Sequence, residues 1–196
     1  MSYRYELIRK LIHLSNLVIP LFLFYNDKHF VLMILAPLSI SFIFLDFLRL
    51  KTKIIAKLYN QYFSIITRDF ESHRLTGASY VFFASCIVIY FYPPNIAIPA
   101  LLIMSISDSM AAIVGEKYGK IKIFNKTLEG SIAFFLSSIC IIIFFDLHLL
   151  PAILSIIITT LVESSKFLNI DDNLSVPLSF SISYSFFCKL LSLNII

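Results

Sequence analysis

The sequence has 196 residues, of which 59% are hydrophobic and 14% are charged, and its mean hydropathy is +0.88. This composition excludes an ordinary soluble domain and predicts a single all-α membrane domain over residues 1–196. The formal net charge is +4, but no basic run with interleaved aromatic residues lies outside the apolar segments, so the sequence predicts no nucleic-acid partner.

Seven apolar segments approach or reach the roughly 20 residues that a helix needs to cross a bilayer. These segments lie at about residues 11–25, 30–48, 75–92, 96–114, 130–145, 150–163 and 175–193. The first and the sixth of them are the shortest. The sequence therefore predicts a polytopic membrane protein with about seven transmembrane helices, and it leaves the oligomeric state open.

Lysine and arginine are distributed unequally between alternate loops. Only Lys28 and Lys189 lie on the side opposite the N-terminus. The positive-inside rule then predicts a multi-pass protein of the inner (plasma) membrane, with its N-terminus in the cytoplasm and its C-terminus outside. The acidic residues follow the same asymmetry, with Asp27 and Asp146 as the exceptions. Charges gathered at one face indicate a site at the inner leaflet, because an ion pathway would spread them through the bilayer depth.

A polar stripe enters the first apolar segment. Arg9, Lys10, His13 and Asn16 recur at three- and four-residue steps, so they share one helix face. Polar side chains at membrane depth face protein or water. The stripe predicts either basic side chains that reach the interface beside a hydrogen-bonded histidine, or a phosphate-binding site.

The second segment ends in a charged pair and is followed by an amphipathic stretch. Asp46 and Arg49 are three residues apart at the cytoplasmic end, which predicts an interfacial ion pair. Residues 50–74 place Ile54, Leu58 and other apolar side chains on one face and lysines elsewhere. This pattern predicts one amphipathic helix on the cytoplasmic surface.

The third segment begins with small residues. Glu71 and Arg74 stand just before it, and the small residues from Gly77 onward predict close helix packing. At its other end, Pro93 and Pro94 predict a tight external turn.

The fourth segment contains a carboxylate, Asp108, about two turns inside its end. Burying a carboxylate without a counter-charge costs at least ~2.5 kcal/mol on insertion scales, so Asp108 needs a lysine or a bound Mg²⁺. Small residues surround it at helical spacing, namely Ser105, Ala111, Ala112, Gly115 and Gly119. The structural alternative is an ordinary packing face whose carboxylate is neutralised by a structural lysine.

A short polar loop follows, with Lys117, Lys120, Lys122 and Lys126. It is not a strand-to-helix phosphate loop, because its spacing is one residue short and no Ser or Thr follows the lysine. Glycines nevertheless permit close backbone approach, and lysines act as point charges for phosphate oxygens. At the start of the next helix, the Thr127 hydroxyl can cap the helix, and Glu129 lies in its first turn.

A second acidic group follows the sixth segment. Glu163 ends that segment, and Asp171, Asp172 and Asn173 precede the last one. The three adjacent residues form either an ordinary helix cap or, with Asp108 and Glu129, a set of hard oxygen ligands that holds Mg²⁺ beside substrate phosphates.

These pieces together resemble the CTP-dependent lipid kinases, the family that includes dolichol kinase, phytol kinase and the yeast-type diacylglycerol kinase. The matches occur in the family's order and cover nearly the whole chain, and the block over residues 108–130 is the most specific. The matching motifs are Arg9-Lys10-x-x-His13, Glu71-x-x-Arg74-x-x-Gly77-Ala78, Ser107-Asp108-x-x-Ala111-Ala112-x-x-Gly115-x-x-x-Gly119-Lys120, Lys126-Thr127-x-Glu129-Gly130, and Glu163 followed by Asp172-Asn173-x-x-x-Pro177.

The resemblance implies transfer of the γ-phosphoryl group of CTP to the hydroxyl of a membrane lipid alcohol at the cytoplasmic face. That alcohol is a polyprenol or dolichol, phytol or diacylglycerol. The catalytic residues we expect are Asp108, Lys120, Lys126, Glu129, Glu163 and Asp172, with Glu163 or Asp172 orienting the hydroxyl. The nucleotide-binding residues we expect are Ala112, Gly115, Gly119, Lys120, Lys122, Lys126, Thr127 and Gly130. The Mg²⁺ ligands we expect are Asp108, Glu129, Asp171 and Asp172, and the further polar site residues are Arg9, His13, Glu71, Arg74 and Asn173.

Two other functions stay open. Phosphatidate cytidylyltransferases share a related Asp, Gly-x-x-x-Gly-Lys and Lys-Thr-x-Glu-Gly pattern and also use CTP, but their C-terminal Gly-rich signature of the Asp-Arg-x-Asp type does not occur here. A small transporter is the non-enzymatic alternative. Inverted repeats with broken helices favour transporters, and the sequence shows no such duplication.

Overall fold

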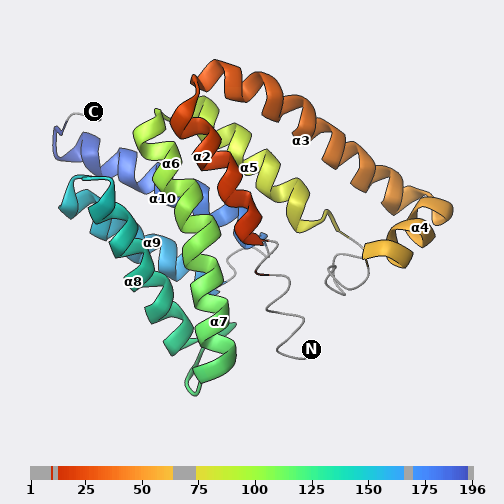
Figure 1. Cartoon of the computed structure of the whole chain (residues 1–196). Helices are drawn as coiled ribbons and strands as arrows, with labels where there is room; N and C mark the ends of the chain where they lie inside the picture. The colour runs from red at the N-terminus through yellow and green to blue at the C-terminus, as the bar shows by residue number, and fades with distance from the viewer. Residues whose placement is uncertain (1–9, 11–12, 64–73, 166–169, 194–196) are drawn as a thin grey trace.

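The computed structural model describes residue 10 and residues 13–63, 74–165 and 170–193. They form a helical bundle with one small hairpin (Figure 1). The helical elements are η1 (Ser15–Leu17), α2 (Val18–Tyr25), α3 (Lys28–Lys51), α4 (Lys53–Phe63), α5 (Gly77–Phe91), α6 (Pro94–Leu102), η3 (Ile103–Ser107), α7 (Asp108–Tyr118), α8 (Leu128–Phe144), α9 (Leu149–Ser165) and α10 (Asp172–Leu190). The hairpin consists of β1 (Lys122–Ile123) and β2 (Lys126–Thr127).

The all-α class is confirmed, and a helix lies at each of the seven predicted positions. Among the described residues, two helices have both the length and the hydropathy of a membrane span, Lys28–Lys51 and Pro94–Tyr118. Four further apolar helices are shorter, namely Ser15–Tyr25, Gly77–Phe91, Leu128–Phe144 and Leu149–Ser165. The number of spans therefore stays a prediction. The amphipathic helix predicted over residues 50–74 is present as α4 but begins at Lys53, because α3 continues to Lys51, and the part over residues 64–73 lies outside the described residues.

The core lies around α10, which packs against α5, α6 and α9. Phe134 and Phe180 are among its largest fully buried side chains. The core also contains a buried hydrogen bond, in which the Ser138 hydroxyl of α8 donates to the Ser107 hydroxyl of η3 at 3.0 Å. Helix α2 packs on α6, the amino-terminal part of the Pro94–Tyr118 helix, and α7, its carboxyl-terminal part, packs on α8.

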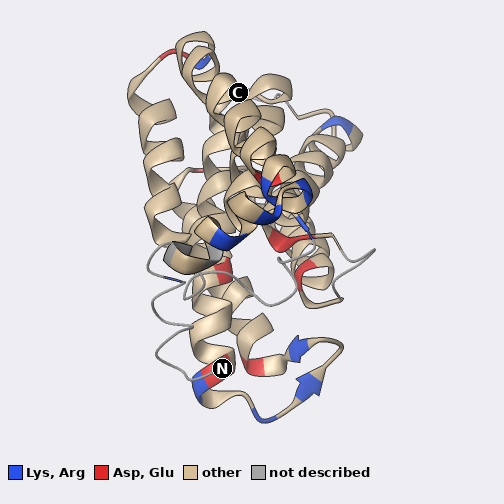
Figure 2. Ribbon diagram, turned by 90° about the vertical axis from the view of Figure 1, so that its right-hand side faces the viewer, with Lys and Arg blue, Asp and Glu red and all other residues tan. Residues whose placement is uncertain are grey.

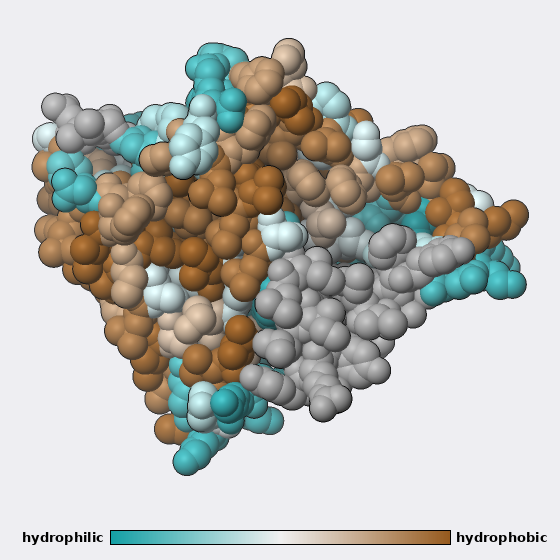
Figure 3. Space-filling model, viewed as in Figure 1, coloured by the Kyte–Doolittle hydropathy of each residue, from teal (hydrophilic) through white to brown (hydrophobic). Residues whose placement is uncertain are grey.

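Apolar side chains cover much of the described surface on the face that Figure 3 shows. Along α3, Met33 is 66% exposed and Ile40 is 68% exposed, and only 22% of its most apolar stretch is buried. A water-soluble protein buries such side chains, whereas lipid solvates them. This outer surface is what a helix facing hydrocarbon requires.

The predicted ion pair of Asp46 and Arg49 is confirmed, and it belongs to a cluster that is buried within the protein. The two residues are 4% and 5% exposed, and Arg49 Nε donates to Asp46 Oδ1 at 3.1 Å. The other oxygen, Oδ2, accepts from Thr76 N at 2.7 Å, Thr76 Oγ1 at 2.8 Å and Ser79 Oγ at 2.6 Å. Arg49 Nη2 donates to the Arg74 carbonyl at 2.6 Å. The cluster thus fastens the end of α3 to the start of α5.

Asp46→Ala is expected to lower the free energy of unfolding by about 3–5 kcal/mol, because it leaves the Arg49 guanidinium buried and unpaired. Thermal unfolding in detergent, followed by circular dichroism, measures the change. The matched control is Asp27→Ala, which removes an exposed cap that accepts from His29 N at 2.8 Å and should cost about 1 kcal/mol. Equal effects of the two variants would contradict the assignment.

The hairpin turns the chain back from α7 toward α8 and α9. Lys122 pairs with Thr127, and Ile123 pairs with Lys126. Its turn rests on the end of α9, because Asn125 Nδ2 donates to the Ser165 carbonyl at 3.1 Å. Figure 2 shows the hairpin lysines at one end of the bundle. This fold brings Lys126 beside residues that are far from it in the sequence.

Candidate active site

Asp108 lies where the regular helix is interrupted. The five residues Ile103–Ser107 form a π-helical turn, and the Asp108 N–H donates to the Ile103 carbonyl. Such turns occur mostly as single insertions, frequently at functional sites. The Asp108 side chain is 9% exposed, so the sequence prediction of a carboxylate that needs a counter-charge is confirmed by its position.

The polar stripe near the N-terminus supplies the first partner of Asp108. Lys10 is 3% exposed, and its ammonium donates to Asp108 Oδ2. His13 Nε2 lies 3.0 Å from the Met104 carbonyl and 3.6 Å from Asp108 Oδ2. Its other nitrogen, Nδ1, lies 3.2 Å from Asn16 Nδ2, so His13 accepts from Asn16 and donates to Met104. The expectation of a hydrogen-bonded histidine is confirmed, and phosphate binding by the stripe stays a prediction.

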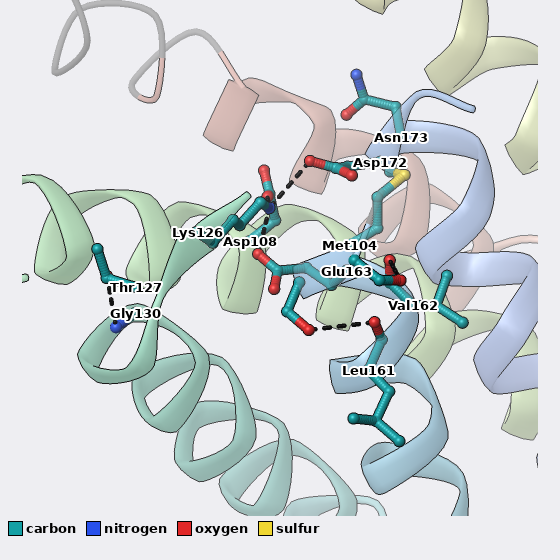
Figure 4. Close-up of polar contacts among 12 residues, drawn as sticks. Met104, Asp108, Lys126, Thr127, Gly130, Leu161, Val162, Glu163, Asp172 and Asn173 are labelled. Carbon is teal, nitrogen blue, oxygen red and sulfur yellow. Dashed lines mark hydrogen bonds and ion pairs between the residues drawn. The ribbon is translucent and has the colours of Figure 1, made fainter. Parts of the chain in front are cut away.

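Lys126 connects Asp108 to two further carboxylates. Its Nζ lies 3.6 Å from Asp108 Oδ1 and 3.0 Å from Asp172 Oδ2, and it donates to Glu163 Oε1. The side chains of these residues point toward one another from α7, β2, α9 and α10 (Figure 4). We call Lys10, Asp108, Lys126, Glu163 and Asp172 the Lys126 cluster.

The cluster holds Lys126 as a cation. Burial by itself lowers the pKa of a lysine, but the carboxylates of Asp108, Asp172 and Glu163 outweigh it and raise the pKa of Lys126 above its ordinary value. The ammonium is therefore charged over the whole physiological range. The Lys126 side chain is 21% exposed. Its positive charge is therefore partly accessible and is suited to bind a phosphate oxygen.

Glu129 was predicted to bind Mg²⁺ together with Asp108, but in the structure it contacts the backbone of a loop. Its carboxylate accepts the backbone N–H groups of Lys120 at 3.0 Å and of Ile121 at 3.3 Å, so it orders the loop between α7 and β1. Lys120 and Lys122 are exposed in that loop. The predicted catalytic and nucleotide-binding roles of these residues stay predictions. The structure brings Glu163, rather than Glu129, to the same lysine as Asp108 and Asp172.

The three glycines of the central block pack α7 tightly on α8. A Cβ on Gly130 would lie 2.8 Å from the Ala111 carbonyl oxygen and 3.3 Å from Gly115 Cα, and a Cβ on Gly115 would lie 2.8 Å from Thr127 Oγ1. A Cβ on Gly119 would lie 2.6 Å from Thr127 Cγ2. Close helix packing thus accounts for the small residues, and nucleotide contact at these positions and at Ala112 stays a prediction. The Thr127 cap is confirmed, since its hydroxyl accepts from Gly130 N at 3.2 Å.

Gly130→Ala is expected to separate α7 from α8 and to cost about 1–3 kcal/mol of stability, because the added methyl group meets backbone atoms that cannot rotate away. A lower thermal midpoint in detergent would report it. The control is Ile132→Ala on the same helix, where the side chain is 48% exposed. An unchanged midpoint for Gly130→Ala would contradict the tight packing.

The remaining expected residues lie around the cluster or outside the described chain. Asp171 caps α10 by accepting from Asn173 N at 3.0 Å, which is the capping interpretation of that loop. The Arg74 backbone takes part in the Asp46 cluster, and Arg9 and Glu71 lie outside the described residues. The residue that we did not expect at the site is Lys10. Its signal was the three-residue spacing to His13, which shows a shared face but not the partner.

The donor chemistry of the cluster fits magnesium that arrives with a nucleotide. In the part of the chain that the structure describes, no group of three or more His, Cys, Asp or Glu side chains is arranged to hold a metal ion. Mg²⁺ is usually bound through one or two carboxylates together with substrate phosphates, not by a protein cage. Asp108 and Asp172 converge on one point, and their side chains are 9% and 12% exposed.

Comparisons with known proteins give one match along the full length and several partial ones. The chain is 33% identical to the Rickettsia prowazekii uncharacterized protein RP860, over 95% of this chain and 96% of that one. It is 31% identical to CTP-dependent diacylglycerol kinase 1 of Saccharomyces cerevisiae, over 67% of this chain and 47% of the yeast protein. It is 30% identical to the Schizosaccharomyces pombe protein of the same name, over 70% of this chain and 66% of that protein. No family model matches the chain, and no solved structure matches it.

Proposed function

We propose that this chain, which belongs to the same family as the Rickettsia prowazekii protein RP860, is a CTP-dependent kinase of a membrane lipid alcohol. The partial-length similarity to two fungal proteins named CTP-dependent diacylglycerol kinase 1 supports a lipid kinase. The chain spans about half to two thirds of the length of those proteins, so the whole activity is part of the proposal. Diacylglycerol is the first substrate to test, ahead of polyprenols and phytol.

The observation that carries the proposal is the Lys126 cluster. Phosphoryl transfer needs little covalent chemistry from the protein, and its catalysis is mostly positioning and charge stabilisation. Lys126 supplies a charged ammonium that would contact the transferred phosphoryl group. Asp108 and Asp172 would hold Mg²⁺, and this ion would neutralise negative charge on the nucleotide phosphates.

The position of the cluster supports a reaction at the inner leaflet. Lys126 belongs to the lysine-bearing hairpin at one end of the bundle (Figure 2). The positive-inside rule assigns such lysines to the cytoplasm, where CTP is present. A lipid hydroxyl lies at the same depth as the membrane interface, so both substrates would meet at this end. Exposed apolar residues on the neighbouring helices, such as Ile132 and Leu136 of α8, are compatible with lipid contact.

Labelled CTP distinguishes the proposed kinase from a cytidylyltransferase. Membranes that contain the protein are incubated with Mg²⁺, with either a lipid alcohol or phosphatidate, and with CTP labelled at either the γ or the α phosphorus, and the lipids are separated by thin-layer chromatography. A kinase transfers the γ label to diacylglycerol. Transfer of the α label to phosphatidate would instead show a cytidylyltransferase, and no labelled lipid with any alcohol or with phosphatidate would contradict both enzymes.

A further inference from the structure

A lysine ammonium stands at the point that three carboxylates share. Lys126 Nζ contacts Asp108, Glu163 and Asp172, which come from three different helices. We infer that these carboxylates form a divalent-cation site and that Lys126 fills it in the nucleotide-free protein. Glu163, which the sequence suggested only as a group that orients the lipid hydroxyl, is then a metal ligand. The cation is a hard one such as Mg²⁺ or Mn²⁺, because all three donors are carboxylate oxygens.

The distances explain why the described carboxylates do not form a ready metal site. Lys126 Nζ keeps Asp172 Oδ2 at 3.0 Å and Asp108 Oδ1 at 3.6 Å. Oxygen ligands of Mg²⁺ lie at about 2.0–2.1 Å. The carboxylates around an ammonium are therefore spread more widely than ligands around a metal ion. Exchange of the ammonium for a divalent cation draws them inward.

The charges of the cluster favour this exchange. Among the described residues, three acidic side chains face two ammonium groups, those of Lys10 and Lys126, so the acidic groups outnumber the basic ones. A buried charge without compensation is costly. A divalent cation in place of the Lys126 ammonium balances the three carboxylates and Lys10 completely. Lys10 stays in place because its partner is the other oxygen of Asp108, Oδ2.

The second oxygen of Glu163 is independent support for a missing ligand. Glu163 is 0% exposed, and while its Oε1 accepts from Lys126, its Oε2 is buried without a hydrogen-bond partner among the described residues. Leaving a buried acceptor unsatisfied is costly, and a bound ion or water is one of the explanations for such a group in a native structure. A metal ion bound by both Glu163 oxygens satisfies this atom.

The exchange would also free Lys126 for the nucleotide. Once the cation takes its place, the ammonium no longer needs to pair with Glu163 and can turn to a phosphate oxygen. This last step rests on the proposed kinase function. The cation site itself does not, because its test uses neither nucleotide nor lipid alcohol.

Mn²⁺ binding to the purified full chain in nanodiscs tests the site. Free Mn²⁺ is measured by electron paramagnetic resonance in the absence of nucleotide. Lys126→Met should tighten Mn²⁺ binding by on the order of a hundredfold, the scale expected when a unit charge a few ångströms away is removed. The double variant Lys126→Met with Glu163→Gln should lose that gain, because it removes one ligand.

Lys57→Met is the control, since Lys57 is an exposed lysine of α4 outside the predicted site, and its Mn²⁺ affinity should equal that of the unmodified protein. Affinity unchanged by Lys126→Met, the same gain in Lys57→Met, or a gain that survives Glu163→Gln would each overturn the inference. If Lys126→Met does not fold without metal, purification in millimolar Mn²⁺ becomes the readout. Recovery of a monodisperse protein supports the site, and failure to recover it overturns the site.

Discussion

Asp108→Asn is expected to lower the rate of lipid phosphorylation by about a thousandfold or more. Asparagine keeps the size of the side chain but removes the charge that faces both Lys10 and Lys126. The two ammonium groups then repel each other without a carboxylate between them, and one oxygen ligand for Mg²⁺ becomes a weaker donor. The initial rate of γ-label transfer from CTP, in membranes with equal amounts of protein, measures the effect.

Glu116→Gln is the control for this substitution. Glu116 is exposed and lies on the same helix, α7, about two turns after Asp108. It should retain the rate of the unmodified protein. Size-exclusion chromatography in detergent verifies that Asp108→Asn is folded, because the change also removes buried ion pairs. A folded Asp108→Asn protein with a normal rate would refute the proposed active site.

The positions of the helices could be predicted from hydropathy, because each apolar segment becomes a helix. The ends could not, since caps and turns decide them. Asp27 caps α3 and extends it to Lys28, and the π-helical turn of Ile103–Ser107 joins two helices into one of 25 residues. Burial of the Asp46 pair was also missed. Its partners Thr76 and Ser79 are 30 and 33 residues away, beyond any helical period.

The residues of the candidate site were predicted only in part, because helical spacing does not show which distant residues meet. Asp108, Lys126 and Asp172 were expected together, and the hairpin brings them together. Glu129 follows Lys126 closely in the sequence, but a carboxylate in the first turn of a helix can equally accept loop N–H groups, as it does from Lys120. Spacing does not distinguish these two uses. Lys10 lies 98 residues before Asp108, so helical periodicity showed its face and not its partner.

Lys126→Met is expected to lower the rate of lipid phosphorylation by about a hundredfold to a thousandfold, because it removes the charge that contacts the transferred phosphoryl group. It should also destabilise the protein at neutral pH, since Glu163 and Asp172 lose their shared counter-charge. The rate of γ-label transfer and the thermal midpoint measure the two effects. Lys57→Met, at an exposed position of α4 outside the predicted site, is the control for both.

The pH dependence of stability distinguishes the contribution of the Lys126 ion pairs from the contribution of its packing. The pKa of Lys126 is raised in the folded protein, so the pairs contribute their full stability below the unfolded value of about 10.4 and lose it as the pH rises through the folded pKa. The difference in midpoint between the unmodified protein and Lys126→Met should therefore stay constant from about pH 8 to about pH 9 and shrink only at higher pH. A difference that vanishes near neutral pH would mean that the ammonium is not held by the three carboxylates, and the catalytic role argued for it would lose its basis.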